Sequence, residues 1–375
     1  MLAEALRLTT SQEDIDELTA QLEAELKECE ATTVSYKNKL KQFMMENDIW
    51  QISELNYYWR EKYCEYLKNR MSKTSCELYI KTFDRVKLHS LRKQPQIILA
   101  GKRQRLEYAD EILYLPYHPN IEIAERFCRE NNKNLLAWDF TLIAAEKLKR
   151  QIFQVLHYFI ENAANSERMH AQLGGLARLY DFCILEQIED LEKLEIDQIE
   201  RFQKTFTTEY QRHYYAGVTY WCGRALFMEA EEIHWDANVW YMERMHLQPE
   251  RIDPAAPIMS LSFAEVTNKE NRKLLQKYLR YGIGIANLSI SSLRTEFLVV
   301  RKFLGDMNQP ETENICMVTE QQMDAWLRSE QQREVQADTF NKKVMCILHF
   351  FQYLQIKDYI TAIPFDPNYY LHATS

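Results

Sequence analysis

Apolar residues recur every three or four positions along most of the chain, which is the spacing of helices that bury one face. The first such stretch follows an approximate capping box at 11–14 and places Ile15, Leu18, Leu22 and Leu26 on one side. Further helices are predicted within 36–43, 50–69, 72–86, 142–159, 166–185, 196–206, 289–304, 319–326 and 339–354. The pattern therefore predicts a mainly helical protein.

The helical spacing fails between residues 95 and 125. Two short apolar runs, at 97–99 and 111–115, lie there between prolines and a glycine, and they predict one small hairpin or an extended linker. A second irregular stretch, 207–287, is rich in aromatic residues. From these breaks we predict an N-terminal helical unit (1–94), a linker (95–125), a central helical unit (126–215), an aromatic-rich helical connector (216–287) and a last helical domain (288–375).

Glycine and proline are scarce, with 8 and 9 residues among 375. Sandwiches, barrels and propellers need these residues at their many turns, so the composition argues against such folds. It also argues against a glycine-rich phosphate loop, because Gly282 and Gly284 lack a third glycine at the required spacing. Hydrophobic residues make up 46% and charged residues 27%, as in soluble globular proteins. The predicted fold class is all-α.

The eight cysteines are at least 12 residues apart, so the chain has no Cys-x-x-Cys pair for zinc binding or redox chemistry. It also has no apolar segment typical of a signal peptide and no run of 18 apolar residues. We therefore expect a cytoplasmic protein with reduced, mostly buried thiols, no membrane contact, no cofactor and no bound metal.

Charge is unevenly distributed, although the formal net charge is −9. Residues 1–31 carry 2 basic and 9 acidic side chains, whereas residues 32–94 carry 13 basic and 7 acidic ones. The basic segment is a candidate surface for a polyanionic partner. The acidic segment beside it leads to the hypothesis that residues 1–31 cover the basic face when no such partner is bound.

The first and last helical units share an order of features that indicates a repeat. Each begins with a helix that carries basic residues. A short acid-bearing segment follows, at 52–55 in the first unit and 318–321 in the last, and each unit ends in a helix entered through a threonine, Thr74 or Thr339. Periodicity alone leaves open that any small helical bundle would show the same order.

Five segments of the last unit add a pattern of residue types to this order. They are 288–294 (LSISSLR), 318–323 (VTEQQM), 338–343 (DTFNKK), 347–354 (ILHFFQYL) and 363–366 (IPFD). These segments resemble the core-binding domain of the tyrosine recombinases, the phage-integrase family. The likeness is good over 285–370, looser over 30–92 and faint between them, and 217–372 as a whole resembles the N-terminal region of integrases carried by bacterial mobile elements.

The resemblance implies tandem helical bundles of the core-binding (SAM-like) type with a helical connector. In that family such a domain clamps one face of duplex DNA through phosphate contacts and a few base contacts. The implied partners are duplex DNA at a recombination site and other recombinase protomers, with no small-molecule substrate. The residues assigned to DNA binding are Arg294, Arg301, Lys302, Asn341, Lys342 and Lys343 in the last unit, and Lys37, Lys41, Lys73, Lys81 and Arg85 in the first.

The family's catalytic set is an arginine, a lysine, a His-x-x-Arg pair and a tyrosine nucleophile, all in a separate C-terminal domain. This chain ends at Ser375, where that domain would begin. His89 and Arg92 match the pair in spacing, but they lie too near the N-terminus to have the required residues before them. We therefore assign no catalytic residue, and whether the chain has enzymatic activity stays uncertain.

Two alternative interpretations follow from other features of the sequence. Glu229, Glu231, Glu232 and His234 could hold a metal ion, but on a helix they would point in different directions, so a solvated acidic face is favoured. The chain as a whole could be a helical adaptor that binds protein and has no nucleic-acid role. That interpretation predicts a large exposed apolar patch.

Overall fold

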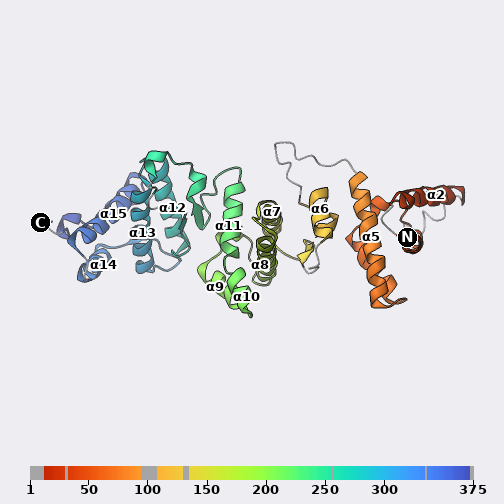
Figure 1. Ribbon diagram of the computed structural model, residues 1–375. Coiled ribbons are helices and arrows are strands. Elements are labelled where there is room, and N and C mark those ends of the chain that lie inside the picture. The colour runs from red at the N-terminus through yellow and green to blue at the C-terminus, as the bar shows by residue number, and fades with distance from the viewer. Residues whose placement is uncertain are drawn as a thin grey trace. The chain divides into compact units, whose positions relative to one another are not determined.

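The computed structural model describes residues 12–29, 33–93, 108–129, 135–252, 254, 257–333 and 336–371. Helices dominate it, as the sequence predicts, and two small antiparallel sheets add four short strands (Figure 1). The chain divides into two compact units, Met1–Ile143 and Ala144–Ser375. The predicted capping serine at 11 and the apolar run at 97–99 lie outside the described residues.

Unit 1 is built around a helical core. Its elements are α2 (Gln12–Glu28), α3 (Val34–Glu46), the 3-10 turn η1 (Ile52–Glu54), α4 (Tyr57–Lys68), α5 (Lys73–Lys93), β1 (Ile112–Tyr114), η2 (Leu115–Tyr117), α6 (Ile121–Cys128) and β2 (Ala137–Asp139). Leu22 and Leu26 of α2 pack with Phe43 of α3, Tyr63 of α4 and Phe83 of α5 in one apolar cluster. The acidic α2 is therefore an integral part of this core.

Residues 112–114 form strand β1, whereas the other apolar run of the predicted hairpin, 97–99, lies outside the described residues. Strand β1 pairs antiparallel with β2, so that Leu113 lies opposite Trp138. Trp138 is 3% exposed, and its burial explains why the strand pairs with this later segment. Residues 108–129 and 135–143 accordingly belong to unit 1, and the boundary lies near 143 instead of within the predicted linker.

Unit 2 begins with a long helical hairpin, α7 (Glu146–Asn162) and α8 (Ser166–Leu185), joined by a short loop. Shorter elements follow: η4 (Leu191–Lys193), α9 (Ile196–Lys204), α10 (Glu209–Tyr214), α11 (Val218–Glu229), β3 (Val239–Tyr241), η5 (Met242–Met245), η6 (Pro249–Arg251) and β4 (Ser260–Ser262). Strand β3 pairs antiparallel with β4, and Trp240 at its centre is fully buried. The predicted helix at 142–159 begins later than expected, because Leu142 is exposed and precedes it.

Unit 2 continues with α12 (Lys269–Gly284), α13 (Ile290–Met307), η7 (Ile315–Met317), α14 (Glu320–Gln332), α15 (Ala337–Ile356) and η8 (Pro367–Tyr369). Ser289 caps α13 and Thr319 caps α14, and both caps confirm the predicted helix starts. Helices α12 and α13 lie side by side in Figure 1. One apolar cluster runs from Phe227 in α11 to Phe365 after α15.

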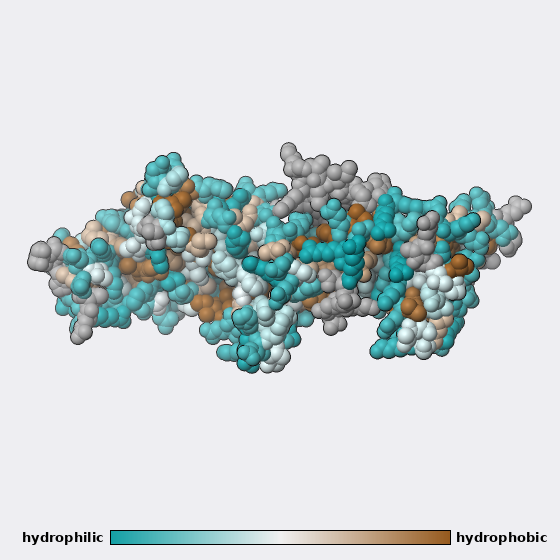
Figure 2. All heavy atoms as spheres, in the orientation of Figure 1, coloured by the Kyte–Doolittle hydropathy of each residue, from teal (hydrophilic) through white to brown (hydrophobic). Residues whose placement is uncertain are grey.

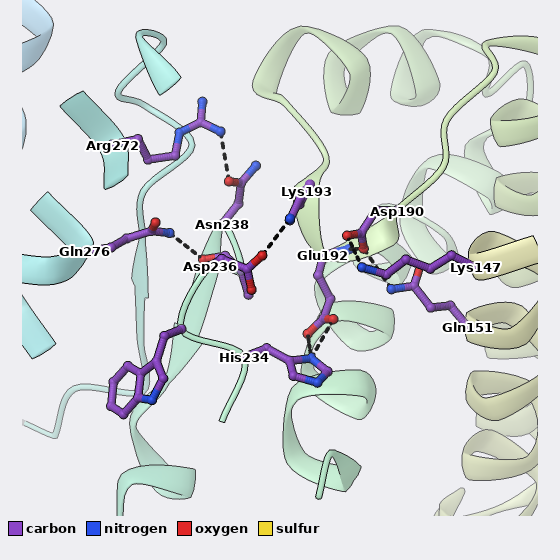
Figure 3. A network of polar contacts seen from close by, with 12 residues as sticks. Lys147, Gln151, Asp190, Glu192, Lys193, His234, Asp236, Asn238, Arg272 and Gln276 are labelled. Atoms are coloured by element: carbon purple, nitrogen blue, oxygen red, sulfur yellow. Dashed lines mark hydrogen bonds and ion pairs between the residues drawn. The ribbon is translucent and has the colours of Figure 1, made fainter. Parts of the chain in front are cut away.

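Polar contacts join the predicted central unit to the predicted connector (Figure 3). Arg272 of α12 is 5% exposed, and its guanidinium lies 2.6 Å from Glu195 Oε2 and donates to Asn238 Oδ1 at 2.8 Å. Glu192 in η4 pairs with His234 at 2.7 Å. These contacts join 144–215 to 216–287, and one apolar cluster joins residues of 227–283 to residues of 290–365. The three domains predicted here therefore lie in a single compact unit.

One local turn occurs in both units with the same spacing. Asp48 after α3 and Gln187 after α8 have φ angles of 56° and 55°, and each is followed by a 3-10 turn four residues later. The next helix begins at Tyr57 in one case and at Ile196 in the other. The first residue of each 3-10 turn and the residue directly after the turn are apolar and buried: Ile52 and Leu55 in one case, Leu191 and Leu194 in the other.

The segment 288–371 contains a related turn, at Ile315–Met317, after Asn308 with a φ of 38°. Its apolar pair is Ile315 and Val318, so the segment 52–55 corresponds to 315–318. The repeat proposed from sequence, which matched 52–55 with 318–321, was therefore three residues out of register. The sequence pattern matched the two segments by their acidic residues, whereas the structure shows that the buried apolar pair defines the turn.

The cysteines are mostly buried, as the sequence predicts. All eight cysteines are free, and only Cys128 and Cys316 are partly exposed. Burial raises the pKa of Cys183, Cys128 and Cys346 to about 12. None of the helices described here combines the length with the hydrophobicity that a bilayer-crossing segment requires.

Candidate nucleic-acid interface

Arg294 and Lys342, two of the cations predicted to bind DNA, lie exposed on α13 and α15. Neither has an ion-pair partner among the residues that the structure describes. Asn341 is half-buried beside Lys342 and already takes part in an intramolecular interaction. Of the cations of 288–371 that were predicted to bind DNA, these two are therefore the ones with no ion-pair partner in the described chain.

Arg301 has a structural contact instead. Its Nη1 lies 2.7 Å from Glu265 Oε1, and its guanidinium covers the ring of Phe297 at 4.9 Å from the centroid. Glu265 precedes α12, so this ion pair fastens α13 to the segment before α12. The contact neutralises Arg301, which sequence reasoning assigned to DNA.

Lys302 and Lys343, which are far apart in the sequence, meet at one buried carboxylate. Lys302 Nζ lies 2.7 Å from Glu330 Oε1, and Lys343 Nζ lies 2.7 Å from Glu330 Oε2. Arg333 also pairs with Glu330, and Asp306 lies 2.9 Å from Lys302. The structure thus brings two predicted cations together, but around an acid that the prediction did not consider. We call Lys302, Glu330, Arg333 and Lys343 the Glu330 cluster.

The Glu330 side chain is 1% exposed, so burial disfavours its charged form. Hydrogen bonds from Lys302 and Lys343 outweigh that cost and hold the pKa of this carboxyl below its usual value. Burial likewise opposes the charge on Lys302, but its bonds to Glu330 and Asp306 raise the pKa of this lysine. Both groups therefore stay charged at neutral pH, and the cluster holds α13, α14 and α15 together.

In unit 1, Lys37 and Lys41 hold the acidic helix α2. Lys37 Nζ donates to the carbonyl oxygens of Leu26 and Cys29, both at 3.0 Å, at the C-terminal end of that helix. Lys41 Nζ lies 2.6 Å from Glu23 Oε1. A lysine at the free carbonyl groups of a helix end is favourable, because the macrodipole is negative there. Both predicted DNA contacts thus have intramolecular partners.

The remaining predicted residues of unit 1 lie on α5. Lys73 and Lys81 are exposed, and neither pairs with a carboxylate in the described part of the chain. Arg85 is exposed as well and has an intramolecular partner. Lys73 is the first residue of α5, directly after the turn that follows α4.

Three cations that sequence reasoning did not single out surround this turn. Lys39 Nζ and the guanidinium of Arg70 both lie over the ring of Tyr66, at 5.1 Å and 3.9 Å from its centroid. Lys68 is exposed at the end of α4. None of the three has a carboxylate partner among the described residues. We call Lys39, Lys68, Arg70 and Lys73 the α4–α5 corner.

The sequence contained part of the signal for this corner. Residues 68–73 read KNRMSK between two predicted helices, a short basic run at an exposed turn. Lys39 could not have been added from the sequence, because only packing of α3 against α4 brings it to Tyr66. The aromatic ring fixes the position of both cations without neutralising them, which suits recognition of phosphate.

Two other groups of residues considered in the sequence are the glutamates near His234 and the His-x-x-Arg pair. No group of His, Cys, Asp and Glu in the described residues has a geometry that could hold a metal ion. His234 contacts Glu192 instead of the neighbouring glutamates. Of the His-x-x-Arg pair, His89 has a buried Nε2 with no hydrogen-bond partner, whereas Arg92 lies 2.7 Å from Glu125.

The chemistry that these surfaces offer is therefore attraction of anions. The α4–α5 corner adds the N-terminal end of the long helix α5, whose free backbone N–H groups favour phosphate. Arg294 and Lys342 offer two further contacts in the other unit. In comparisons with known proteins, no family model, no curated protein and no solved structure matches this chain.

Proposed function

We propose that this chain binds duplex DNA and acts as the DNA-binding region of a tyrosine-recombinase-like protein. The α4–α5 corner would contact phosphates from unit 1, and Arg294 and Lys342 would do so from unit 2. The proposal includes a core-binding type of bundle for residues 288–371 and other recombinase protomers as partners.

The α4–α5 corner is the observation that carries this proposal. Its four cations have no carboxylate partner among the described residues, in a chain whose net charge is −9. Phosphate contacts by lysine and arginine supply most non-specific DNA affinity, since each one releases condensed counterions. Cations that are already neutralised by a buried carboxylate contribute less to such binding.

A protein adaptor is the competing function, and it would need a continuous exposed apolar surface. On the face shown in Figure 2, hydrophobic residues form small separate areas among hydrophilic ones. This observation favours the DNA-binding proposal over the adaptor.

The test is fluorescence anisotropy of the full chain with a labelled mixed-sequence duplex at several salt concentrations. We expect log K to fall linearly with log salt. The variant R70A/K73A should reduce the slope by about 0.9 for each phosphate that the protein no longer neutralises. The matched control is K62A/K273A, which removes two exposed lysines that pair with Glu65 and Glu270.

Two results would contradict the proposal. One is a lack of binding even near ~50 mM salt, where phosphate contacts are strongest. The other is an equal loss of affinity in R70A/K73A and in the control, which would mean that overall charge matters and the α4–α5 corner does not. Either result would favour the protein-adaptor function instead.

A further inference from the structure

A cleft of about 300 Å³ opens between α7, α8 and α11 in unit 2. Its size is at the lower end of the range of about 300–1,000 Å³ that small-molecule sites occupy. The polar and aromatic side chains that line it include Tyr158, Arg168, Gln172, Tyr220, Trp221 and Arg224. The sequence resemblance implied no small-molecule substrate, and the proposed function leaves this cleft unused.

The lining of the cleft is cationic and contains no acidic side chain. Arg168, in the first turn of α8, is exposed and has no ion-pair partner within the described chain. Arg224 lies 2.6 Å from Glu243 and also donates to the Tyr158 hydroxyl at 3.4 Å. Arg168 is therefore the group available to an anion, and Arg224 is held in place beside it.

Gln172 provides an independent indication of a ligand. Its side chain is buried, with 7% of the residue exposed, yet its Oε1 has no hydrogen-bond partner. A buried acceptor without a donor costs about 1–3 kcal/mol, and native structures rarely leave one unsatisfied. Since Gln172 lines the cleft, a ligand N–H or O–H group would satisfy this oxygen.

Gln172 and Arg168 stand one turn apart on the same face of α8. The glutamine lies deep and the arginine lies at the rim, because one is buried and the other exposed. A ligand would therefore place its hydrogen-bond donor inward and its negative charge outward. The N-terminal end of α8, with its positive macrodipole, favours the same orientation.

Three aromatic side chains complete the cleft. Tyr158 comes from α7, whereas Tyr220 and Trp221 come from α11. Aromatic rings next to a cleft stack on flat π-systems, and stacking on a nucleobase is worth about 1–3 kcal/mol. Together with an inward donor and an outward charge, this arrangement matches a flat heterocycle that carries a phosphate.

We propose that this cleft binds a nucleoside monophosphate, with the base between the aromatic rings, an N–H group of the base on Gln172 Oε1 and the phosphate on Arg168. The site lies apart from the α4–α5 corner in the sequence and does not depend on the proposed DNA binding. It gives the chain a second ligand of a different chemical class.

Isothermal titration calorimetry of the full chain with AMP, CMP, GMP and UMP tests this site. At least one nucleotide should bind saturably near or below ~1 mM. R168A should weaken that nucleotide about tenfold, because it removes a charge-assisted hydrogen bond. Q172L, which keeps the volume and removes the acceptor, should weaken it severalfold. R178A, an exposed arginine on the same helix outside the cleft, should bind as the wild type does.

The parent nucleoside, ribose 5-phosphate and inorganic phosphate separate the contributions. The nucleoside should bind more weakly than the nucleotide and should be insensitive to R168A. Equal binding of ribose 5-phosphate or inorganic phosphate would overturn the proposal, since the base would then contribute nothing. A lack of saturable binding for all four nucleotides would overturn it as well, and so would an R178A effect equal to that of R168A. Thermal unfolding of each variant checks that it folds.

Discussion

In unit 1, the cations of the α4–α5 corner face solvent with no acidic partner among the described residues, whereas in unit 2 Lys302, Arg333 and Lys343 surround the buried carboxylate of Glu330. Both regions look alike in the sequence, as lysines and arginines on helix surfaces. The first keeps its charge available for a polyanion. The second uses most of its charge to hold three helices together.

This difference explains why a count of basic residues is a poor guide to a binding surface. When a neighbouring helix contributes a buried carboxylate, a lysine that was a candidate DNA contact forms a structural ion pair with it instead. The reverse also holds, since the ring of Tyr66 gathers Lys39 and Arg70 without cancelling their charge. The following predictions test how far the two regions differ.

The largest effect is expected from E330A. It leaves Lys302, Lys343 and Arg333 without their shared carboxylate. We expect the free energy of unfolding to fall by about 2 kcal/mol, measured by urea unfolding followed by circular dichroism. Full burial of the pair would give about 3–5 kcal/mol, but the cations are partly exposed and water screens them. The control E77A, at an exposed acid on α5, should stay within about 0.5 kcal/mol of the wild type. Equal effects of E330A and E77A on the free energy of unfolding would show that the Glu330 cluster stabilises the fold no more than an exposed acid does.

Lowering the pH should reduce the contribution of Glu330 to the stability of the fold. The folded pKa of Glu330 lies below its ordinary value of 4.5, so its stabilisation is present above that value and is lost as pH falls through the folded pKa. The gap in melting temperature between the wild type and E330Q should therefore be constant near neutral pH and narrow below pH 4.5. A gap that does not change down to about pH 3 would show that the carboxylate charge does not stabilise the cluster.

A smaller effect is expected when one cation of each region is removed. K343M takes one of several donors from Glu330 and should cost about 1 kcal/mol. K73M removes an exposed lysine with no partner in the described chain and should stay within about 0.5 kcal/mol of the wild type in the same urea experiment. In DNA binding the order should reverse, with K73M more harmful than K343M. If K343M were the more harmful variant in both assays, the α4–α5 corner would not be the region that binds DNA.

The smallest effect concerns the acidic helix α2. Deleting residues 1–31 would remove Leu22 and Leu26 from the core, so the covering hypothesis needs a milder test. E23Q/E28Q releases Lys41 and Lys93 from exposed ion pairs, which are worth about 0–1 kcal/mol each. DNA affinity measured by anisotropy should rise severalfold, and an unchanged affinity would mean that α2 does not shield these lysines.

The helices were predictable because each has a continuous apolar face, and caps such as Ser289 and Thr319 mark their starts. The pairing of β1 with β2 was not, because nothing local to 111–115 indicates a partner at Trp138. The candidate site was predictable only as a set of charges. Glu330 is 28 residues from Lys302 and 13 from Lys343, and only the packing of α14 brings the three side chains together.

The turn that occurs after α3 and after α8 has a consequence for the order in which the chain folds. Ile49 N donates to Met44 O, and Ile188 N donates to Cys183 O, both at 2.9 Å, so each turn closes between residues five apart. Such short loops close in about 10–100 ns, and local contacts speed folding. Strand β2 must instead find a partner some 25 residues earlier. We therefore expect the two turns to nucleate early and the sheet of unit 1 to form late, an order that pulsed hydrogen exchange would resolve.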